Sequence, residues 1–443
     1  MFRKALFILG HKIQYPKFYS LYKQTIKKQW RPYEEQKKLQ GKKLQKIIRF
    51  AYENVPYYHT LFKERNISPD DVQKIKDLEN LPILSKEKIR ANWEDLKPVN
   101  LSSMEYIKRT TGGTTGTPLE YRLSKRDRFL GVALIYRGLG YGGYDLGDKM
   151  LFLGGSSIGV DSTSFFKKKI DEVIRNIRKL SSFDMEEKEM KEYTKILNSK
   201  KPKFIRGYSS AIHFYAKWLQ KNEIRTHSPD AIFTTSENLH PKMRGLISDT
   251  FDCEVFDHYG LNDGGVSAFE CPKHNGLHID TERSVMEVVD EENCQLETGK
   301  GRILATSLNN FAMPFIRYET GDRAHIVKDK CECGRDSKLL KEILGRTVDI
   351  FTTPEGKSVH GWFFLYIMWE YCEGVQRYQV VQNEIDHILI KLVINEDFDE
   401  GQLDKIREIM NEKSESWNLE FRFVDEIEPT ESGKHKFIIS EVE

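Results

Sequence analysis

The stretch Ala231-Ile232-Phe233-Thr234 lies between two segments with helical periodicity, residues 209–222 and 241–250. A short run of β-branched and aromatic residues between polar flanks is typical of a buried strand. The same pattern recurs in Met150-Leu151-Phe152-Leu153, Phe204-Ile205 and Glu254-Val255-Phe256. Strands that alternate with helices usually pair in parallel, with helices covering the sheet. We therefore expect a layered α/β fold.

The chain is too long for one core, because its 443 residues exceed the ~250–300 at which single cores stop growing. Further strand patterns occur at residues 284–290, 301–307 and 323–327. After Gly345-Arg346 the pattern restarts as an α+β unit, with a helix over 400–415 and strands near 376–383, 387–394 and 420–424. We expect a large α/β domain over residues 1–348 and a small mobile α+β lid domain over residues 349–443.

The region before residue 100 is expected to be helical scaffold. Apolar residues at helical spacing predict helix over residues 34–66, with a stop at Val55-Pro56. Ser85 is a candidate N-cap for a further helix over residues 86–94.

The charges nearly cancel, with 69 basic and 67 acidic side chains, so the whole molecule has no field that favours nucleic acid. Lysines cluster among aromatic residues in the first fifty positions, where a solvated helix face is the simpler explanation and peripheral membrane contact stays open. The apolar opening lacks a cleavage site, and no stretch approaches the ~18 apolar residues of a transmembrane segment. Six unevenly spaced cysteines do not resemble a disulfide framework. We expect a cytoplasmic protein.

The stretch Arg109-Thr110-Thr111-Gly112-Gly113-Thr114-Thr115-Gly116-Thr117-Pro118 predicts a phosphate-binding loop. Glycines let backbone amides approach an anion closely, and threonine hydroxyls add donors. It is not a Walker A motif, because Thr117 stands where that motif has lysine. A Gly/Thr turn without a ligand is the alternative.

Four further stretches combine glycine with an aromatic, acidic or basic residue, and each is a common turn in isolation. They are Phe256–Asp263, Tyr318–Arg323, Leu344–Asp349 and Pro429–Lys436. An aromatic ring can stack on a purine, a carboxylate can bind Mg²⁺ or ribose hydroxyls, and arginine can neutralise phosphate charge.

The order and spacing of these stretches resemble the adenylate-forming superfamily of acyl-CoA synthetases and adenylation domains. The resemblance is strongest to its phenylacetate–CoA ligase-like branch, which includes CapK-like proteins of capsular-polysaccharide clusters. It spans almost the whole chain, since Ala51–Tyr58 and Leu81–Lys86 also resemble the N-terminal region of that branch. It implies an ATP-dependent ligase that activates a carboxylic acid as its acyl-AMP, releases pyrophosphate and transfers the acyl group to an acceptor.

The resemblance also implies residue roles. The phosphates of ATP would be clamped by Thr110, Thr111, Gly112, Gly113, Thr114, Thr115 and Gly116. The adenine and acyl pocket would be lined by Ser236, Glu237, Asn238, Tyr259 and Gly260, with Tyr259 stacked on adenine. Asp322 would hold the ribose, Arg346 would contact phosphate or ribose, Asp349 would be the hinge and Lys434 the mobile catalytic lysine. Asp263 falls where the family usually has a magnesium-binding glutamate.

Two cysteine-containing turns predict a structural zinc site. Cys271 precedes His274 and His278, and Cys331 and Cys333 follow some sixty positions later. Three thiols and one imidazole would complete a closed tetrahedral site. The spacing favours His274 for a tight knuckle, whereas His278 sits on an expected strand, so the histidine ligand stays open. Buried free cysteines beside surface histidines are the alternative.

Two other functions remain open. One is an adenylyltransferase whose AMP adduct is the final product, and the other is an inactive homologue with a structural role in a polysaccharide pathway. The acceptor is left open among coenzyme A, a carrier-protein thiol and an amine, and a homodimer is left open as well.

Overall fold

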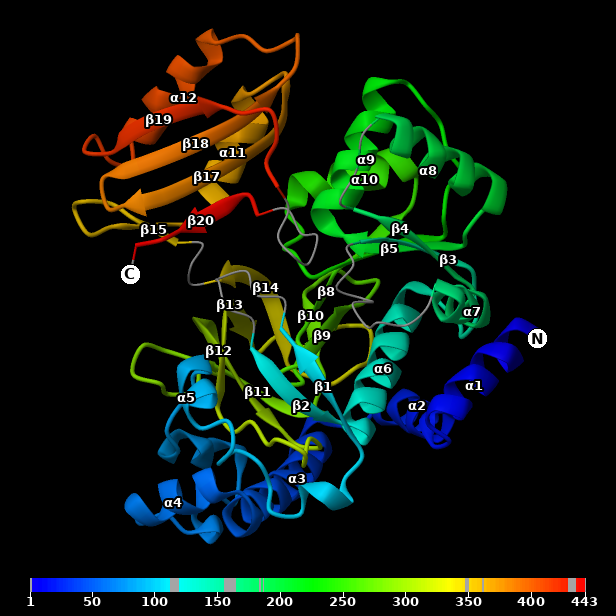
Figure 1. Cartoon of the computed structure of the whole chain (residues 1–443), viewed down its shortest axis with the longest axis vertical. Coiled ribbons are helices and arrows are strands. Elements are labelled where there is room, and N and C mark those ends of the chain that lie inside the picture. Colours follow the sequence, from blue (N-terminus) through cyan, green and yellow to red (C-terminus); the bar gives the residue numbers. More distant parts are fainter. Residues whose placement is uncertain are drawn as a thin grey trace. The chain divides into compact units, whose positions relative to one another are not determined.

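A computed structural model of the chain describes residues 2–111, 119–154, 165–182, 185, 187–346, 350–360, 362–428 and 436–442. The described residues divide into two compact units, one up to Leu344 and the other from Gly345 onward (Figure 1). The expected boundary and hinge residue, Asp349, lies outside the described residues. Within the described part, no helix is both long and apolar enough to cross a membrane.

A five-stranded parallel sheet confirms the α/β expectation. Its order is β4-β3-β5-β6-β7. The strands are β3 (Met150–Gly154), β4 (Ile177–Ser181), β5 (Phe204–Tyr208), β6 (Ala231–Thr235) and β7 (Glu254–Phe256). The helices between them are α7 (Phe165–Arg175), α8 (Glu187–Lys200), α9 (Ser209–Lys221) and α10 (Pro241–Phe251). All five residues of β3 and of β6 are buried, as expected for strands covered on both faces.

A seven-stranded sheet follows in the same unit, in the order β11-β12-β13-β14-β10-β9-β8. Its strands are β8 (His258–Gly260), β9 (Ser267–Glu270), β10 (Leu277–Ile279), β11 (Ser284–Val289), β12 (Gly299–Ser307), β13 (Tyr318–Val327) and β14 (Leu339–Arg346). A separate antiparallel hairpin joins β1 (Tyr106–Thr110) to β2 (Glu120–Ser124). Leu119, Tyr121 and Leu123 from this hairpin share a core with Tyr318 of β13.

The N-terminal region is helical. Its α-helices are α1 (Phe2–Gln14), α2 (Phe18–Lys28), α3 (Tyr33–Asn54), α4 (Pro56–Glu64), α5 (Lys86–Ala91) and α6 (Lys125–Leu139). Short 3-10 helices are η1 (Pro69–Asp71), η2 (Ile75–Asn80), η3 (Leu101–Ser103) and η4 (Gly140–Gly142). Val55 is extended because proline disfavours helical backbone in the preceding residue, so the expected helix over 34–66 is two helices. The Ser85 hydroxyl accepts from the Lys88 amide at 3.3 Å, which confirms the N-cap.

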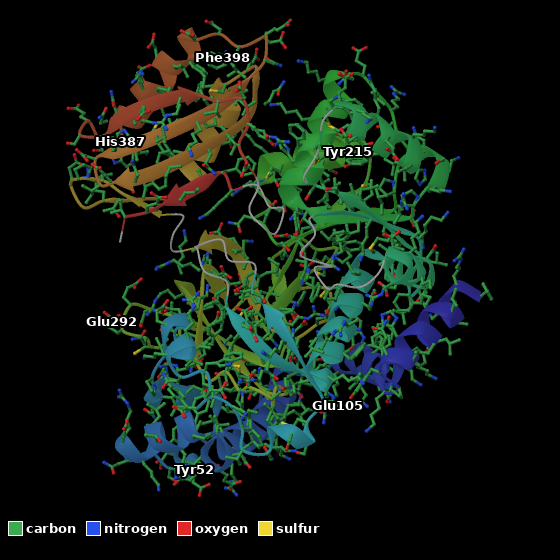
Figure 2. The ribbon with its side chains drawn as sticks, in the orientation of Figure 1. Tyr52, Glu105, Tyr215, Glu292, His387 and Phe398 are labelled. Atoms are coloured by element: carbon green, nitrogen blue, oxygen red, sulfur yellow. The ribbon has the colours of Figure 1, made fainter. Side chains whose placement is uncertain are left out.

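The second unit is an α+β unit, as expected. Its elements are β15 (Ile350–Thr352), β16 (Ser358–His360), α11 (Trp362–Tyr371), β17 (Val375–Glu384), β18 (His387–Ile394), α12 (Gly401–Asn411), β19 (Asn418–Phe423) and β20 (Ile438–Ser440). The four-stranded sheet has the order β19-β18-β17-β20. Figure 2 labels His387, the first residue of β18, and Phe398, which follows the end of that strand. Periodicity does not predict α11, because its sequence WFFLYIMWEY is almost wholly apolar.

A buried histidine anchors α1 to the first unit. The His11 ring stacks between Phe7, at 4.2 Å between centroids, and Phe18, at 4.4 Å. Its Nδ1 lies 3.0 Å from the carbonyl oxygen of Phe7. Burial, with a smaller contribution from Arg175, lowers the pKa of His11 to about 4. The fold therefore requires a neutral imidazole at this position.

His11→Phe is expected to make thermal stability less dependent on pH. In the unfolded chain the imidazole takes up a proton near pH 6.5, whereas the folded pKa is about 4, so stability falls as pH drops through this window. Between pH 7 and pH 5 this single group contributes roughly 2 kcal/mol of that loss. Melting temperatures of the parent and the variant at both pH values check this. An equal decrease in both proteins contradicts it.

Candidate functional site

Tyr259 and Asp322 lie side by side although 63 residues separate them. The Tyr259 hydroxyl, on β8, donates to Oδ2 of Asp322, on β13, at 2.9 Å. These strands stand four positions apart in the sheet order, which would be about 19 Å in a flat sheet. A tyrosine side chain cannot span that distance, so the sheet must curl to bring β8 toward β13. The structure thus joins two residues expected at one nucleotide site.

Asp263 is held by the same strand. The Tyr318 hydroxyl donates to Oδ2 of Asp263 at 2.8 Å. Tyr318 and Asp322 are both buried positions in the alternating pattern of β13 and share one face of the strand. One face of β13 therefore fixes two carboxylates, Asp322 in the strand and Asp263 through the phenol of Tyr318. Sequence analysis gave Tyr318 no role, although it begins the quoted stretch that ends at Arg323.

The hairpin that carries the Gly/Thr stretch is closed at its base. The Thr111 amide donates to the carbonyl of Leu119 at 2.9 Å, and the Leu119 amide donates to the Thr111 hydroxyl at 3.0 Å. Thr110 pairs with Glu120. Gly112, Gly113, Thr114, Thr115 and Gly116 lie outside the described residues. The structure thus defines where the loop leaves and re-enters the fold.

Aromatic packing connects this hairpin to the carboxylates. The Tyr121 ring, on β2, lies 6.3 Å from Phe315, which lies 4.9 Å from Tyr318. Burial, and next the charge of Asp263, raises the pKa of the Tyr121 phenol. Tyr121, two residues beyond the base of the loop, is therefore close enough to Asp263 for the carboxylate charge to act on its phenol.

Ser236, Glu237 and Asn238 follow β6 at the carboxyl end of the parallel sheet, where ligands commonly bind in such folds. Ser236 has a φ of 71°, a backbone conformation that residues other than glycine rarely adopt. Oε2 of Glu237 accepts from the Ser210 amide at 2.9 Å, at the start of α9. The Asn238 side chain donates to the carbonyl of Ile343 in β14 at 3.4 Å. The segment thereby connects the two sheets.

The remaining residues expected at the nucleotide site are placed only in part. Gly260 ends β8 directly after Tyr259, and Arg346 ends β14. The structure describes the backbone of Arg346 but not its side chain. Lys434 lies outside the described residues.

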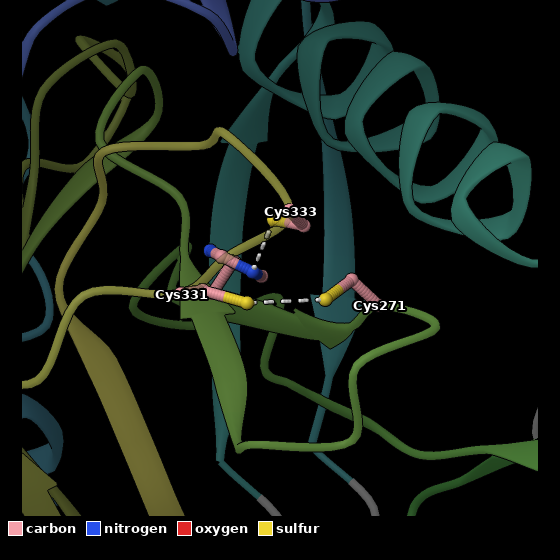
Figure 3. Close-up of side chains that lie close together, drawn as sticks. Cys271, Cys331 and Cys333 are labelled. Atoms are coloured by element: carbon pink, nitrogen blue, oxygen red, sulfur yellow. Dashed lines mark hydrogen bonds between the residues drawn. The ribbon is translucent and has the colours of Figure 1, made fainter.

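Three thiols and one imidazole converge in the first unit (Figure 3). The ligand atoms of Cys271, His278, Cys331 and Cys333 all lie within 4.8 Å of one another. The Cys271 and Cys331 sulfurs are 3.5 Å apart, and the Cys333 sulfur is 3.3 Å from Nε2 of His278. Metal–sulfur bonds of about 2.3 Å in a tetrahedron place ligand atoms about 3.7 Å apart, so the cluster fits a zinc-sized ion.

Adjacent strands explain the convergence. Cys271 directly follows β9 and His278 lies on β10, which pairs with both β9 and β14. Nδ1 of His278 lies 2.8 Å from the Ser337 hydroxyl, which leaves Nε2 directed at the thiols. Burial, helped by Arg335 and Arg137, lowers the pKa of His278 to about 4. The ring is therefore neutral at physiological pH, which is the form that binds metals.

His274 lies with other partners. Its Nδ1 is 3.0 Å from Oε1 of Glu270, and this carboxylate also accepts two bonds from Arg244, at 2.9 and 3.1 Å. The hydrogen bond with Glu270 raises the pKa of His274. Of the two histidines left open by the sequence, the structure therefore places His278 with the thiols.

Sequence comparison finds relatives over most of the chain. Residues 351–441 match the family described as CapK C-terminal domain. Over 413 residues the chain is 26% identical to protein CapK of Staphylococcus aureus, covering 91% of this chain and 89% of CapK. Over 390 residues it is 25% identical to a phenylacetate-coenzyme A ligase of Thermus thermophilus, with 83% of each chain covered.

Solved structures share the fold. A 2-hydroxyisobutyryl-CoA ligase in the postadenylation state with R3-HIB-AMP has a TM-score of 0.73 at 18% identity, covering 93% of this chain and 90% of the ligase. The same ligase with 2-HIB-AMP and CoA in the thioesterification state gives 0.62 at 19% identity, over 92% and 90% of the two chains. The chain is thus similar in sequence to CapK and to phenylacetate-coenzyme A ligases, and it shares the fold of a 2-hydroxyisobutyryl-CoA ligase.

Proposed function

We propose that the chain is an acid–thiol ligase that activates a carboxylic acid with ATP. The carboxylate oxygen attacks the α-phosphorus of ATP, the bond to pyrophosphate breaks, and an acyl-AMP forms. A thiol or amine then attacks the acyl carbon and AMP leaves. Coenzyme A is the acceptor we favour, since similar ligases bind it. A role in cytoplasmic polysaccharide synthesis is a further part of the proposal, and it rests on the resemblance to CapK-like proteins of capsular-polysaccharide clusters.

One observation carries the proposal: the hydrogen bond between Tyr259 and Asp322 across four strand positions. It sets an aromatic ring for stacking on adenine beside a carboxylate for accepting ribose hydroxyls. Asp263, held over the same strand by Tyr318, adds a carboxylate for Mg²⁺ near the triphosphate. Thr110, Thr111 and the loop after them would bind the phosphates through amides and hydroxyls.

Residues from both units would supply further groups. Lys434 would neutralise charge that develops at the α-phosphate, and Arg346 would contact phosphate or ribose. Ser236, Glu237 and Asn238 would line the adenine and acyl pocket. Thr114, within the phosphate loop, would donate to phosphate oxygens.

We propose a structural zinc ion on Cys271, His278, Cys331 and Cys333. Bound there, zinc would tie the turn after β9 to the loop before β14, a loop that contains Ser337. The site is closed, since four protein ligands complete a tetrahedron and leave no open position for substrate. Its role would therefore be stability of the first unit rather than chemistry.

Pyrophosphate exchange with a panel of carboxylic acids tests the function. Exchange of labelled pyrophosphate into ATP with at least one acid, and mass spectrometric detection of acyl-AMP, is the expected result. Offering coenzyme A and simple amines then identifies the acceptor. Folded protein that binds ATP but exchanges with no acid would instead favour the inactive homologue. Asp263→Glu, which restores the residue usual in the family, shows whether the shorter carboxylate limits exchange.

Tyr259→Ala is expected to weaken ATP binding more than Tyr259→Phe does. Phenylalanine keeps the ring that would stack on adenine and loses only the donor to Asp322. Stacking contributes about 0.5–1.5 kcal/mol to the binding free energy, so the Tyr259→Ala variant should bind ATP about two- to tenfold more weakly than the Tyr259→Phe variant. Titration calorimetry with ATP measures the difference. Equal affinities in the two variants would remove the stacking role from Tyr259.

A further inference from the structure

Helix α1 presents an apolar stripe to solvent. Phe2, Leu9 and Ile13 are 77%, 56% and 75% exposed, and Leu6 between them is partly exposed. At 100° per residue these four positions fall within an arc of about 60°. They form one continuous face of the helix, which we name the α1 stripe. Solvent exposure of so many large apolar groups on one helix face marks an interaction site.

The stripe is held in place by the opposite face of the same helix. Phe7, Gly10 and His11 are buried, and His11 is stacked between Phe7 and Phe18. The Lys4 ammonium also bonds the carboxylate of Asp145 at 2.7 Å. The helix is therefore fixed to the body of the first unit and cannot turn its stripe inward.

A second helix extends this apolar surface. Helix α7 packs beside α1, as Figure 1 also shows. The helices meet where a Cβ on Gly10 would lie only 2.2 Å from Ile174. Next to Ile174, Val173 is 60% exposed, and Ile170, one turn earlier, is 48% exposed. Two neighbouring helices thus leave large aliphatic groups exposed around one contact.

The charge of the N-terminal segment is strongly biased. Residues 1–33 contain eight lysines and arginines and no aspartate or glutamate. The whole chain has a net charge of +2, so the remaining residues carry −6. Arg3 and Lys12 are exposed and flank the α1 stripe on either side. The segment is therefore a cationic surface on an otherwise acidic molecule.

We propose that the α1 stripe docks on an anionic lipid bilayer. An amphipathic helix with an apolar face and basic flanks lies in the plane of the interface with its apolar side about 5–10 Å into the boundary. The negative charge of acidic headgroups complements the positive charge of residues 1–33, which include no aspartate or glutamate. A second copy of the chain fits less well, because a twofold contact on this face would oppose two cationic segments. Docking of this kind would hold the proposed ligase at a membrane surface.

Vesicle flotation with the full chain tests the proposal. The parent should bind phosphatidylcholine vesicles containing phosphatidylglycerol at low salt. It should bind pure phosphatidylcholine far less, and high salt should release it because surface charges are screened beyond about 10 Å at 0.1 M. Leu9→Ser with Ile13→Ser should weaken binding by about tenfold or more. Arg3→Gln with Lys12→Gln should weaken it by roughly fivefold for each charge.

Matched control variants remove the same number of exposed apolar or cationic side chains at positions outside α1 and α7. Val99→Ser with Ile385→Ser, at positions 73% and 45% exposed, and Lys63→Gln with Arg65→Gln should bind as the parent does. Unchanged melting temperatures establish that each variant is folded. The proposal is overturned if the stripe variants and the control variants bind equally. It is also overturned if the parent does not bind anionic vesicles at low salt. A parent dimer that becomes monomeric in Leu9→Ser with Ile13→Ser, without lipid binding, assigns the stripe to a second copy and overturns it as well.

Discussion

Lys434→Ala is expected to abolish useful acyl-AMP formation while leaving ATP binding nearly unchanged. The lysine would act on charge that develops only as the carboxylate attacks the α-phosphate, so its effect belongs to the transition state. Loss of one such group typically lowers the rate by ~10²–10³. Pyrophosphate exchange with the true acid measures the adenylation step, and calorimetry measures ATP affinity.

Lys436→Ala is the matched control, since it removes an ammonium two residues away. The backbone carbonyl of Lys436 accepts from the Gln379 side chain at 3.0 Å, a bond that alanine retains. This variant should keep the parent rate within a few fold. Transfer from pre-formed acyl-AMP should survive Lys434→Ala, because the lysine is proposed to stabilise charge only in the first half-reaction. A large loss in Lys436→Ala alone would move the catalytic role to that residue.

His278→Ala is expected to lose zinc and much of the stability of the first unit. The parent should contain about one zinc per chain, and a structural metal site contributes folding free energy directly. Loss of a metal is among the few mechanisms by which one substitution costs more than about 4 kcal/mol. Elemental analysis and melting temperatures of protein purified without chelator provide the measurements.

His274→Ala is the control for the same element of sequence. It removes a partner of Glu270 but leaves the four convergent ligand atoms intact, so zinc content should stay at the parent value. Ser337→Ala should give an intermediate result, because loss of the hydroxyl beside Nδ1 of His278 typically lowers metal affinity by about 10–100-fold. Zinc retained in His278→Ala and lost in His274→Ala would reverse the assignment.

Local patterns predicted the elements whose signals are complete within a few residues. The parallel strands β3, β5, β6 and β7 were expected from short apolar runs, and the Ser85 N-cap from one residue type at one position. The prediction placed the end of α12 four residues too late, since the helix ends at Asn411. No glycine or proline follows there to mark the end in the sequence. Helix α11 gave no periodic signal, since an almost wholly apolar helix has no polar face.

The candidate site shows the same limit at longer range. The residue types of Tyr259, Asp263 and Asp322 suggested nucleotide chemistry, and the resemblance assigned their roles. Tyr318 could not be recognised in this way, because its contact with Asp263 joins positions 55 residues apart. The spacing of residues along the chain does not predict that a sheet will curl enough to bring together two strands four positions apart in it.

The sequence by itself determined the layered α/β class, the α+β pattern near the C-terminus and the chemical types of residue at the candidate sites. Only the tertiary structure decided that Tyr259 meets Asp322, that His278 rather than His274 joins the thiols, and that the α1 stripe faces solvent. The physical reason is that periodicity and spacing fix backbone geometry over a few residues. Which side chains meet, and which face of a helix is covered, depends on segments brought together from distant positions by burial of the core.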